Sequence, residues 1–392
     1  MVAKGDCSAP CRPYARRRTR GAYACSWGKI TAALVAFLLG AAPAASASDV
    51  LRAELQRRSA ARELAQQVLE RGFEEQRPHV LAACSLFRDE APYLLEWVLW
   101  HYLSGVQHFH LFDNGSSDGS RAALQALVDR GLVTYHSWPG PKRAAQQAQL
   151  DHCFNGSVAS EWVVSHDLDE FLVLPSEDTD RPLLLRHRVP LLHELLRRYR
   201  AAGVGAVMLN RLHFGSQPHR EHPQGELAVT SYLFRLMFLE APRQDALLGK
   251  PILLREAVIA AVGAHEVDLR SGWACTNALR QPCNTSSFAY EPVRINHYVT
   301  RSHAECLAKA GNNNSAQASN WRLEVGATFC AMFWPGSPGY YREEHVRDEL
   351  AARSMQALVV QSLIKHLRPS PAAVGAHDAV DTTAADKRSG RA

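Results

Sequence analysis

The sequence predicts an α/β fold in which a mostly parallel sheet is flanked by helices in a single domain. Short apolar segments alternate with helical segments of about 10–15 residues, which is typical of β-α-β units. Acidic residues directly follow two of the apolar segments, at Asp113 and at Asp167-Leu168-Asp169. Because ligands of such sheets bind at the carboxyl ends of the strands, we expect both acidic features on one edge of the sheet.

The first part of the domain alternates strictly between the two kinds of element. Strands are expected at residues 80–87, 107–112, 132–138 and 161–166. Helices are expected at residues 91–104, 121–130 and 144–154. Gly105 and Gly131 follow the first two helices as stop signals, and residues 114–119 form a polar, glycine-bearing turn.

The second part is less regular. We expect helices at residues 190–202, 302–310 and 343–367, the second of them capped by Ser302. Strands are expected at residues 204–210, 229–239 and 252–262. The polar segment at residues 211–225 is expected to be a loop.

The two ends of the chain differ from the domain at residues 78–367. Residues 1–29 are basic, residues 30–48 are apolar or small, and residues 49–77 have the composition of a helical stem. The apolar segment is either a cleaved signal peptide or a short signal anchor. In both cases the basic flank predicts a lumenal domain. Residues 368–392 contain few large apolar residues, and we expect a disordered tail.

Charge and cysteine content narrow the classes of protein. The net charge is +5 over 392 residues, with much of the excess in the N-terminal segment, so nucleic-acid binding is not predicted. Nine cysteines fit an oxidising compartment. We expect a disulfide between Cys275 and Cys283, and a buried thiol at Cys84. Sequons for N-glycosylation begin at Asn114, Asn155, Asn284 and Asn313.

The acidic pair Asp167 and Asp169 follows the apolar strand that contains Trp162. Two carboxylates in such a place are costly unless a cation neutralises them. Carboxylate oxygens are hard ligands that suit Mn²⁺ or Mg²⁺. Such a metal commonly holds a diphosphate, which favours an enzyme that uses a nucleotide sugar.

An ordered set of motifs resembles glycosyltransferase family 92. The opening motif spans residues 87–102, the second motif is residues 112–120, and the third is Asp167-Leu168-Asp169-Glu170-Phe171. The pattern continues through the segments at residues 214–216, 250–252, 265, 296–298, 302 and 309. Arg88-Asp89 stands where Lys-Asn is usual, and Cys306 where an aromatic residue is usual. These departures bear on substrate fit more than on fold.

The resemblance implies a GT-A fold and inverting transfer of a sugar, typically galactose, from a UDP-sugar to a glycan acceptor with Mn²⁺. It favours a signal anchor and a single-pass type II protein of the Golgi membrane over a secreted protein. Metal ligands are expected at Asp167, Asp169 and His297, with His265 as the rival of His297. Glu170 is expected to support the metal ligands. The nucleotide sugar is expected to contact Arg88, Glu90, Asp113, Asp167, Lys250 and Lys309.

The acceptor side is less defined. Inverting transfer needs a general base, and Glu226 and Asp245 are preferred over Glu221 and Glu266. One or two of four tryptophans are expected to stack on sugar rings: Trp138, Trp273, Trp321 and Trp334. Asp118 is expected either to contact ligand or to cap the helix that follows it.

Two other functions remain open. Another metal-dependent nucleotide transferase would need a phosphate loop, yet neither G-x-x-x-x-G-K nor G-x-G-x-x-G is present. A non-catalytic carbohydrate-binding protein on a decayed transferase scaffold would have lost its metal ligands. Because Asp167, Asp169 and His297 are all retained, the sequence favours the transferase.

Overall fold

A computed structural model describes most of the expected domain, and residues 56–392 form one compact unit. The described residues are 46–73, 79–154, 158–175, 191–236, 249–261, 263, 265–283, 288–311, 323–335 and 345–368. Residues 1–29, nearly all of the apolar segment at 30–48, and the expected tail at 369–392 lie outside them. None of the helices within the described ranges has the length and apolar character required to cross a membrane.

The expected stem is a helix, α2 (Ala47–Arg71), whose first residues belong to a separate unit that ends at Leu55. Within the larger unit, Ala61, Ala65 and Val68 are buried. These positions recur at intervals of three and four residues, so one face of the helix packs and the rest is solvated.

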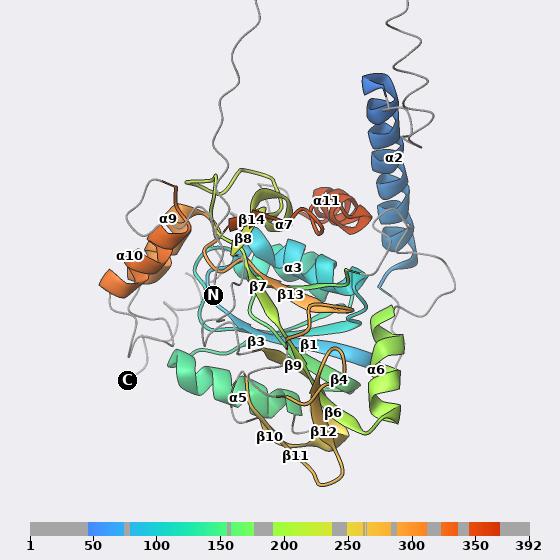
Figure 1. Cartoon of the computed structure of the whole chain (residues 1–392), viewed down its shortest axis with the longest axis vertical. Helices are drawn as coiled ribbons and strands as arrows, with labels where there is room; N and C mark the ends of the chain where they lie inside the picture. The colour runs from blue at the N-terminus through green and yellow to red at the C-terminus, as the bar shows by residue number, and fades with distance from the viewer. Residues whose placement is uncertain are drawn as a thin grey trace, which may run out of the picture. The chain divides into compact units, whose positions relative to one another are not determined.

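A central sheet of seven strands organises the domain (Figure 1). Its strands in spatial order are β12 (Ala274–Asn277), β6 (Val204–Leu209), β9 (Lys250–Leu254), β4 (Ser160–Ser165), β1 (His79–Phe87), β2 (His108–Asp113) and β3 (Val133–Ser137). Neighbouring strands are parallel except at β9, which is antiparallel to both β4 and β6. The predicted mostly parallel α/β sheet is confirmed, and so are the first four strands of the sequence.

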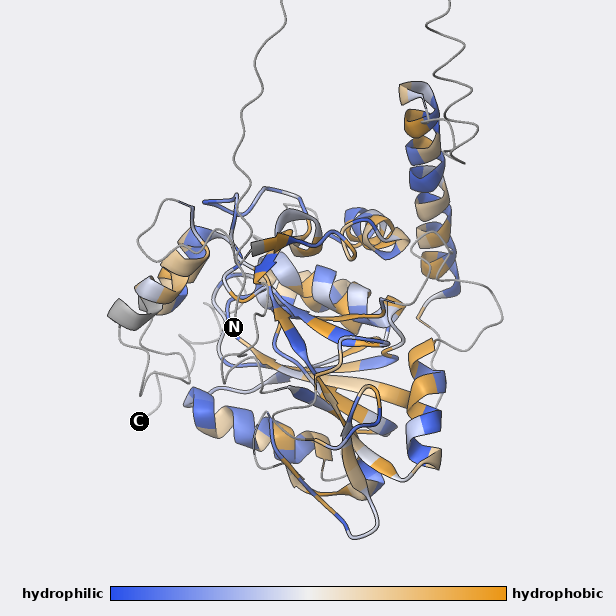
Figure 2. Ribbon diagram, in the orientation of Figure 1, coloured by the Kyte–Doolittle hydropathy of each residue, from blue (hydrophilic) through white to orange (hydrophobic). Residues whose placement is uncertain are grey.

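Helices cover both faces of the sheet. The flanking helices are α3 (Ala91–Leu103), α4 (Ser120–Val128), α5 (Lys142–Phe154) and α6 (Leu191–Ala201). In Figure 1, α3 and α5 lie on opposite faces. The alternation of side chains along β1 explains this arrangement: Ala82 and Cys84 pack with Cys153 of α5, while Leu81 and Ala83 join the cluster on the other side. Figure 2 shows apolar residues concentrated in the central strands and mixed with polar ones along the helices.

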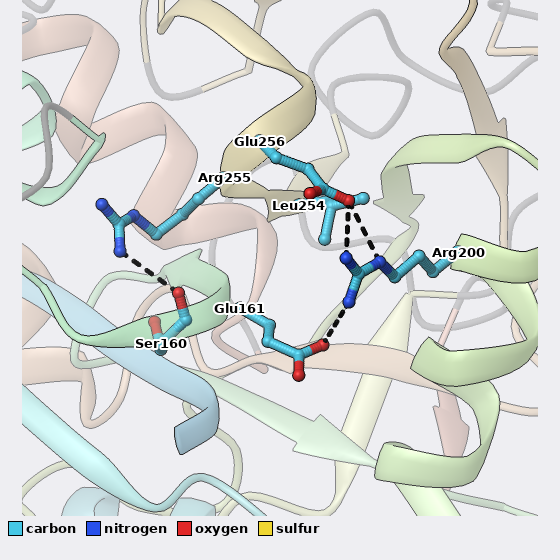
Figure 3. A pocket seen from close by; sticks show the side chains of 6 residues that line it. All are labelled: Ser160, Glu161, Arg200, Leu254, Arg255 and Glu256. Atoms are coloured by element: carbon cyan, nitrogen blue, oxygen red, sulfur yellow. Dashed lines mark hydrogen bonds and ion pairs between the residues drawn. The ribbon is translucent and has the colours of Figure 1, made fainter. Parts of the chain in front are cut away.

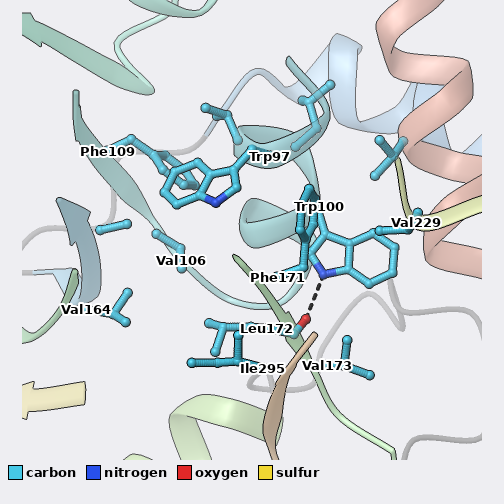
Figure 4. Close-up of a cluster of buried hydrophobic side chains, with 14 of the residues drawn as sticks. Trp97, Trp100, Val106, Phe109, Val164, Phe171, Leu172, Val173, Val229 and Ile295 are labelled. Atoms are coloured by element: carbon cyan, nitrogen blue, oxygen red, sulfur yellow. Dashed lines mark hydrogen bonds between the residues drawn. The ribbon is translucent and has the colours of Figure 1, made fainter. Parts of the chain in front are cut away.

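The larger core lies between the sheet and α3. Trp97, Trp100 and Phe109 are buried there with Phe171 and Leu172 (Figure 4). The indole nitrogen of Trp100 donates to the carbonyl of Leu172 at 2.6 Å, and that of Trp97 donates to the carbonyl of Glu170 at 2.9 Å. These bonds satisfy the polar atoms of both rings and fix the segment that follows the acidic motif.

A second, three-stranded sheet was only partly predicted. It consists of β5 (Glu170–Val173), β13 (Arg294–His297) and β7 (Arg211–His213), with β13 in the middle. The expectation that residues 211–225 are all loop is therefore wrong for the first three of them. In the register of this sheet, His297 pairs with Glu170 on one side and with His213 on the other. The sheet thus brings a distant part of the chain to the acidic motif.

The strand expected at residues 229–239 is also wrong at its start. The chain instead forms a helical turn, α7 (Ala228–Ser231), followed by the short strand β8 (Phe234–Leu236). The carboxylate of buried Glu96 accepts the N–H groups of Ala228 and Val229 at 2.8 and 3.0 Å. This long-range cap supplies acceptors to the first turn of a helix, and apolar periodicity cannot reveal it.

The last expected helix begins later than predicted. Residues 345–347 form strand β14 (His345–Arg347), which pairs with β8, and helix α11 runs over Met355–Leu367. Ser354 caps this helix by accepting the N–H of Ala357. The strand expected at residues 252–262 is likewise interrupted by a 3₁₀ turn, η1 (Arg255–Ala257). The turn is followed by β10 (Val258–Ala261), which pairs with β11 (Val267–Leu269).

Two further helices and three disulfides complete the described fold. Ser302 caps α9 (His303–Gly311) as predicted, and Glu305 returns a bond to the N–H of Ser302. The Cys306–Cys330 disulfide joins α9 to α10 (Leu323–Met332). The expected Cys275–Cys283 disulfide is present. The buried thiol expected at Cys84 is wrong, because Cys84 is bonded to Cys153.

Candidate functional site

The acidic features meet at one edge of the central sheet, where parallel strands β1, β2 and β4 end. Asp113 is the last residue of β2 and pairs in register with Phe87 at the end of β1. Its Oδ1 accepts the N–H of Ser116 at 2.7 Å, and its Oδ2 accepts the hydroxyl of Tyr135 at 2.5 Å. The buried carboxylate of Asp113 therefore orders the polar turn expected at residues 114–119.

That turn also binds the segment after β1. Asp89 has a positive φ of 54° and accepts the N–H of Ser117 at 2.7 Å. Asp118 accepts the N–H of Ala91 at 2.8 Å and of Ser120 at 3.1 Å, so it contacts the first residues of both α3 and α4. The N-cap position of α4 is Gly119, without a side-chain cap, so Asp118 contacts the start of the helix from one residue before the cap. Arg88 is half exposed and lies 3.4 Å from Asp89.

The carboxylate of Asp169 is buried between two nitrogen groups. Its Oδ1 lies 3.4 Å from Nε2 of His297, and its Oδ2 accepts from Nζ of Lys309 at 2.8 Å. Burial alone would raise the pKa of Asp169, but Lys309 and His297 outweigh it and hold this pKa well below the ordinary value. Asp169 is consequently an anion in the folded protein.

Lys250 forms the second charged group of the site and is only 2% exposed. Its Nζ lies 2.9 Å from Oδ2 of Asp167 and 3.5 Å from Oε2 of Glu170. The other oxygen of Glu170, Oε1, accepts from Arg211 at 3.1 Å. Burial would raise the pKa of Glu170, but Lys250, His297 and Arg211 lower it far below the usual range. The carboxylate of Asp167 remains half exposed. Glu170 therefore anchors the cations beneath the acidic motif.

The structure decides which histidine contacts Asp169. His297 does so from the end of β13. His265 instead bonds the carbonyl of Gly249 through Nδ1 at 2.8 Å, and burial together with nearby Lys250 lowers its pKa. His265 is therefore placed beside the start of β9, and His297 is the histidine at the acidic motif.

The distance between Asp169 and His297 fits one shared cation. Two ligands bound at about 2.0–2.2 Å lie about 3.0 Å apart at adjacent octahedral positions and about 3.4 Å apart in a tetrahedron. The observed separation is 3.4 Å. An aspartate oxygen and a neutral imidazole are ligands that Mn²⁺ accepts.

Sequence reasoning missed Arg301, which lies next to the cap of α9. Its guanidinium pairs with Glu90 and lies over the ring of Tyr93, with Cζ 3.8 Å from the ring centroid. Burial would lower the pKa of Arg301, but Glu90 and Asp169 raise it. Burial raises the pKa of Glu90, against the effect of Arg301. The sequence did contain a signal for Arg301, because this basic residue lies between the motif residues Tyr298 and Ser302.

Among the described residues, no contact joins an expected general base to Asp169. Glu226 is exposed in the loop before α7, where its backbone carbonyl bonds Nε2 of His222 at 3.1 Å. Glu221 and Glu266 are exposed as well. Asp245 lies outside the described residues.

The four tryptophans proposed for the acceptor differ in their surroundings. Trp138 packs on Phe112 in the core beneath α5, and Trp334 stacks on His303 with ring centroids 4.6 Å apart. Trp273 is half buried beside the larger core, and Trp321 lies outside the described residues. Trp138, Trp273 and Trp334 are all partly exposed, and Trp334 is the one that lies against α9.

A surface pocket lies at the opposite end of β4, where Ser160 begins the strand (Figure 3). Arg200 bridges Glu161 and Glu256 at 3.0 and 2.9 Å, and Arg255 bonds the carbonyl of Ser160. These charges neutralise one another, and the pocket lies away from the strand ends that carry Asp113 and Asp167. It is not a candidate for the donor site.

Comparisons with known proteins agree with the ordered motifs. Residues 77–266 match the sequence model of Glycosyltransferase family 92. A glycosyltransferase family 92 protein of Ricinus communis is 27% identical over 212 residues, covering 53% of this chain and 35% of the relative. One from Oryza sativa subsp. japonica is 29% identical over 202 residues, covering 51% of this chain and 31% of the relative. This chain thus spans about a third of the length of these relatives.

Solved structures show only distant likeness. The mannosyltransferase PcManGT from Pyrobaculum calidifontis, in complex with GDP-Man and Mn²⁺, has a TM-score of 0.31 and 14% identity, covering 80% of this chain and 96% of that one. S. aureus TarS in complex with UDP has a TM-score of 0.28 and 10% identity, covering 45% and 47%. Likeness this distant says nothing about the donor of this chain. Residues 77–266 match the family model and the named relatives carry the same family name: this region is a glycosyltransferase family 92 domain, as the ordered motifs indicate.

Proposed function

We propose that this protein transfers a sugar from a nucleotide-sugar donor to a glycan acceptor, with a divalent cation held by Asp169 and His297. The observation that carries the proposal is the 3.4 Å separation between Asp169 Oδ1 and His297 Nε2 at the carboxyl edge of the sheet. Membership of the family supports glycosyl transfer as the reaction class. The family also favours UDP-galactose as the donor, Mn²⁺ (or Mg²⁺) as the metal and inversion at the anomeric carbon.

The lysines of the site suit a diphosphate. Lys309 is 60% exposed in its side chain, and its pKa is raised by Asp169, so it is a cation within reach of a bound ligand. Lys250 lies deeper, and we assign it to holding Asp167 in position as much as to contacting the donor. When bound, the metal would offset the charge that develops on the departing diphosphate.

The nucleoside would lie beside the strand ends that carry Arg88, Glu90 and Asp113. Asp113 has both oxygens engaged by Ser116 and Tyr135, so it would shape the pocket wall through the turn. The partly buried pair of Glu90 and Arg301 lies close enough to Asp169 for the charges to interact. Asp167, half exposed, is the carboxylate best placed to meet the ribose or a water molecule of the metal.

In the transfer itself, an acceptor hydroxyl would attack the anomeric carbon as the bond from that carbon to the diphosphate oxygen breaks. A carboxylate must take the hydroxyl proton. Glu226 and Asp245 are our candidates, with Glu226 on the exposed loop that leads into α7.

We also propose a Golgi membrane location, reached through the segment at residues 30–48 as a signal anchor, with secretion after cleavage as the other outcome.

A panel of UDP-sugars tests the proposal. The full chain is assayed for donor hydrolysis and for transfer to glycan acceptors, with Mn²⁺, with Mg²⁺ and with EDTA. We expect turnover of one UDP-hexose with Mn²⁺ and loss of at least tenfold with EDTA. Equal rates with and without EDTA would remove the metal from the mechanism. Donor binding without turnover of any donor would indicate a carbohydrate-binding protein, and nucleotidyl products would indicate another transferase.

A further inference from the structure

Three histidines converge on the α5 side of the central sheet, apart from the acidic motif. They are His110 of β2, His136 of β3 and His152 of α5, and one ring nitrogen from each lies within 4.8 Å of the other two. Nδ1 of His110 and Nε2 of His136 are 3.3 Å apart. Among the described residues, this is the one set of three histidine, cysteine or acidic side chains with such spacing.

The fold holds these rings together through sheet register and a disulfide. His136 pairs in register with Phe112, two positions after His110, so both histidines lie on one face of the parallel strands. Cys84 of β1 is the register partner of His110, and it is bonded to Cys153, the neighbour of His152. The disulfide therefore fixes α5 at the level of the sheet where His110 lies.

The surroundings of the cluster are aromatic. Phe112 stacks on His136 with ring centroids 4.3 Å apart, and Trp138 lies 5.8 Å from His152. Burial, helped by neighbouring histidines, lowers the pKa of His110 to about 3, and burial also lowers that of His136. Neutral imidazoles have lone pairs free for a metal. Nitrogen donors without a carboxylate favour Zn²⁺, Cu²⁺ or Ni²⁺ over Mg²⁺ and Ca²⁺.

The spacing matches tetrahedral coordination. Metal–nitrogen bonds of about 2.0–2.1 Å in a tetrahedron place two nitrogens about 3.3–3.4 Å apart. The distance between Nδ1 of His110 and Nε2 of His136 already has this value. The ring nitrogen of His152 lies at most 4.8 Å from the other two, so it needs to move by about 1.5 Å or less to reach the same spacing. We propose that His110, His136 and His152 form a second metal site, one that takes Zn²⁺ or a similar transition-metal ion with a fourth position open to water.

The test uses the full chain after removal of metal with a chelator. Zn²⁺ affinity is measured by competition with a chromogenic chelator, and Co²⁺ is added as a spectroscopic probe of tetrahedral geometry. We expect one Zn²⁺ per chain at this site and visible Co²⁺ absorption bands of tetrahedral intensity. His136→Gln and His152→Gln should each weaken Zn²⁺ binding at least tenfold. His366→Gln, which changes an exposed histidine of α11, should leave it unchanged.

The Asp169→Asn variant distinguishes metal bound at the acidic motif from metal bound at the histidine cluster. This variant should retain the Zn²⁺ and Co²⁺ signals of the cluster. X-ray absorption of this variant loaded with Zn²⁺ needs no histidine substitution, so it remains decisive if His136→Gln or His152→Gln fails to fold. Three imidazole nitrogens around zinc are expected. A shell dominated by oxygen, or Zn²⁺ affinity equal in the wild type, His136→Gln and His152→Gln, would overturn the site and leave a hydrogen-bonded cluster of core histidines.

Discussion

Oδ1 of Asp169 lies 3.4 Å from Nε2 of His297, although 127 residues separate them in the chain. The link is the register of the small sheet, in which His297 pairs with Glu170, the residue after Asp169. The N–H of Tyr298 also donates to the carbonyl of Asp169 at 2.7 Å. Because backbone bonds on both sides fix the two side chains, the pair is organised before any ligand arrives.

The first prediction concerns this pair. Asp169→Asn and His297→Gln should each weaken Mn²⁺ binding in the presence of UDP by more than about tenfold, because each removes one ligand of the proposed cation. Isothermal titration calorimetry or the EPR signal of free Mn²⁺ measures the change. Asp268→Asn, an exposed aspartate of β11, is the control and should bind Mn²⁺ as the wild type does. Unchanged affinity in both site variants would place the metal elsewhere.

The second prediction contrasts two lysines that both contact the acidic motif. Lys250→Met should lower the free energy of unfolding by about 3–5 kcal/mol, because it leaves the buried charge of Glu170 without one of its cations. Lys309→Met should lower it by less than about 1 kcal/mol, since the side chain of Lys309 is largely exposed. Urea denaturation measures both values.

UDP affinity should show a different dependence on these lysines. Lys309→Met is expected to weaken UDP binding because it removes an exposed cation beside Asp169. Lys250→Arg serves as the second variant, since it keeps the charge beneath Asp167 and Glu170. If Lys250→Met were as stable as the wild type, Lys250 would be a ligand-binding residue and not the anchor described above.

The sequence was sufficient for the elements whose signals are local. The strand ends at Asp113 and Asp167 could be placed on one edge because strands and helices alternate regularly up to residue 166. The cap of α9 was predictable because Ser302 and Glu305 lie three residues apart. The small sheet formed after β4 could not be predicted in this way. Its strands β5, β7 and β13 have three or four residues each, and they pair across long stretches of chain.

Side-chain roles were harder to predict when the partner is distant in sequence. Glu96 belongs to the opening motif, but its contacts with Ala228 and Val229 follow only from the tertiary structure. Arg301 was missed for the same reason, as its partners Glu90 and Tyr93 lie more than two hundred residues earlier. Cys84 looked like a core thiol because its strand is apolar, and its partner on α5 carries no local signal.

The third prediction is a pH dependence of stability at Glu96. Burial raises the pKa of Glu96 from 4.5 to about 7, although two backbone N–H donors oppose the rise. The folded protein thus binds this proton more tightly than the unfolded chain does. The stability due to this group is fully present below pH 4.5 and is lost as the pH rises through about 7.

The difference in pKa corresponds to about 3 kcal/mol. Glu96→Gln removes the titration, so the free energy of unfolding of the wild type should fall relative to that of Glu96→Gln between pH 4.5 and 8. Denaturation at a series of pH values measures this difference. Glu266→Gln, an exposed glutamate, should follow the wild type throughout. Parallel curves for the wild type and Glu96→Gln would show that Glu96 has an ordinary pKa in the folded state.

The last prediction tests Glu226 as the general base. Its loop is fixed at the backbone, because His222 bonds the carbonyl of Glu226 and the hydroxyl of Tyr232, while the carboxylate itself is exposed toward solvent. Glu226→Gln should lower kcat by at least about a hundredfold, since the amide cannot take the acceptor proton. UDP affinity should be unchanged, because Glu226 contacts none of the groups around Asp169. Glu221→Gln is the control on the same loop and should keep the wild-type kcat. An unaltered kcat in Glu226→Gln, together with a loss in Asp245→Asn, would assign the base to Asp245.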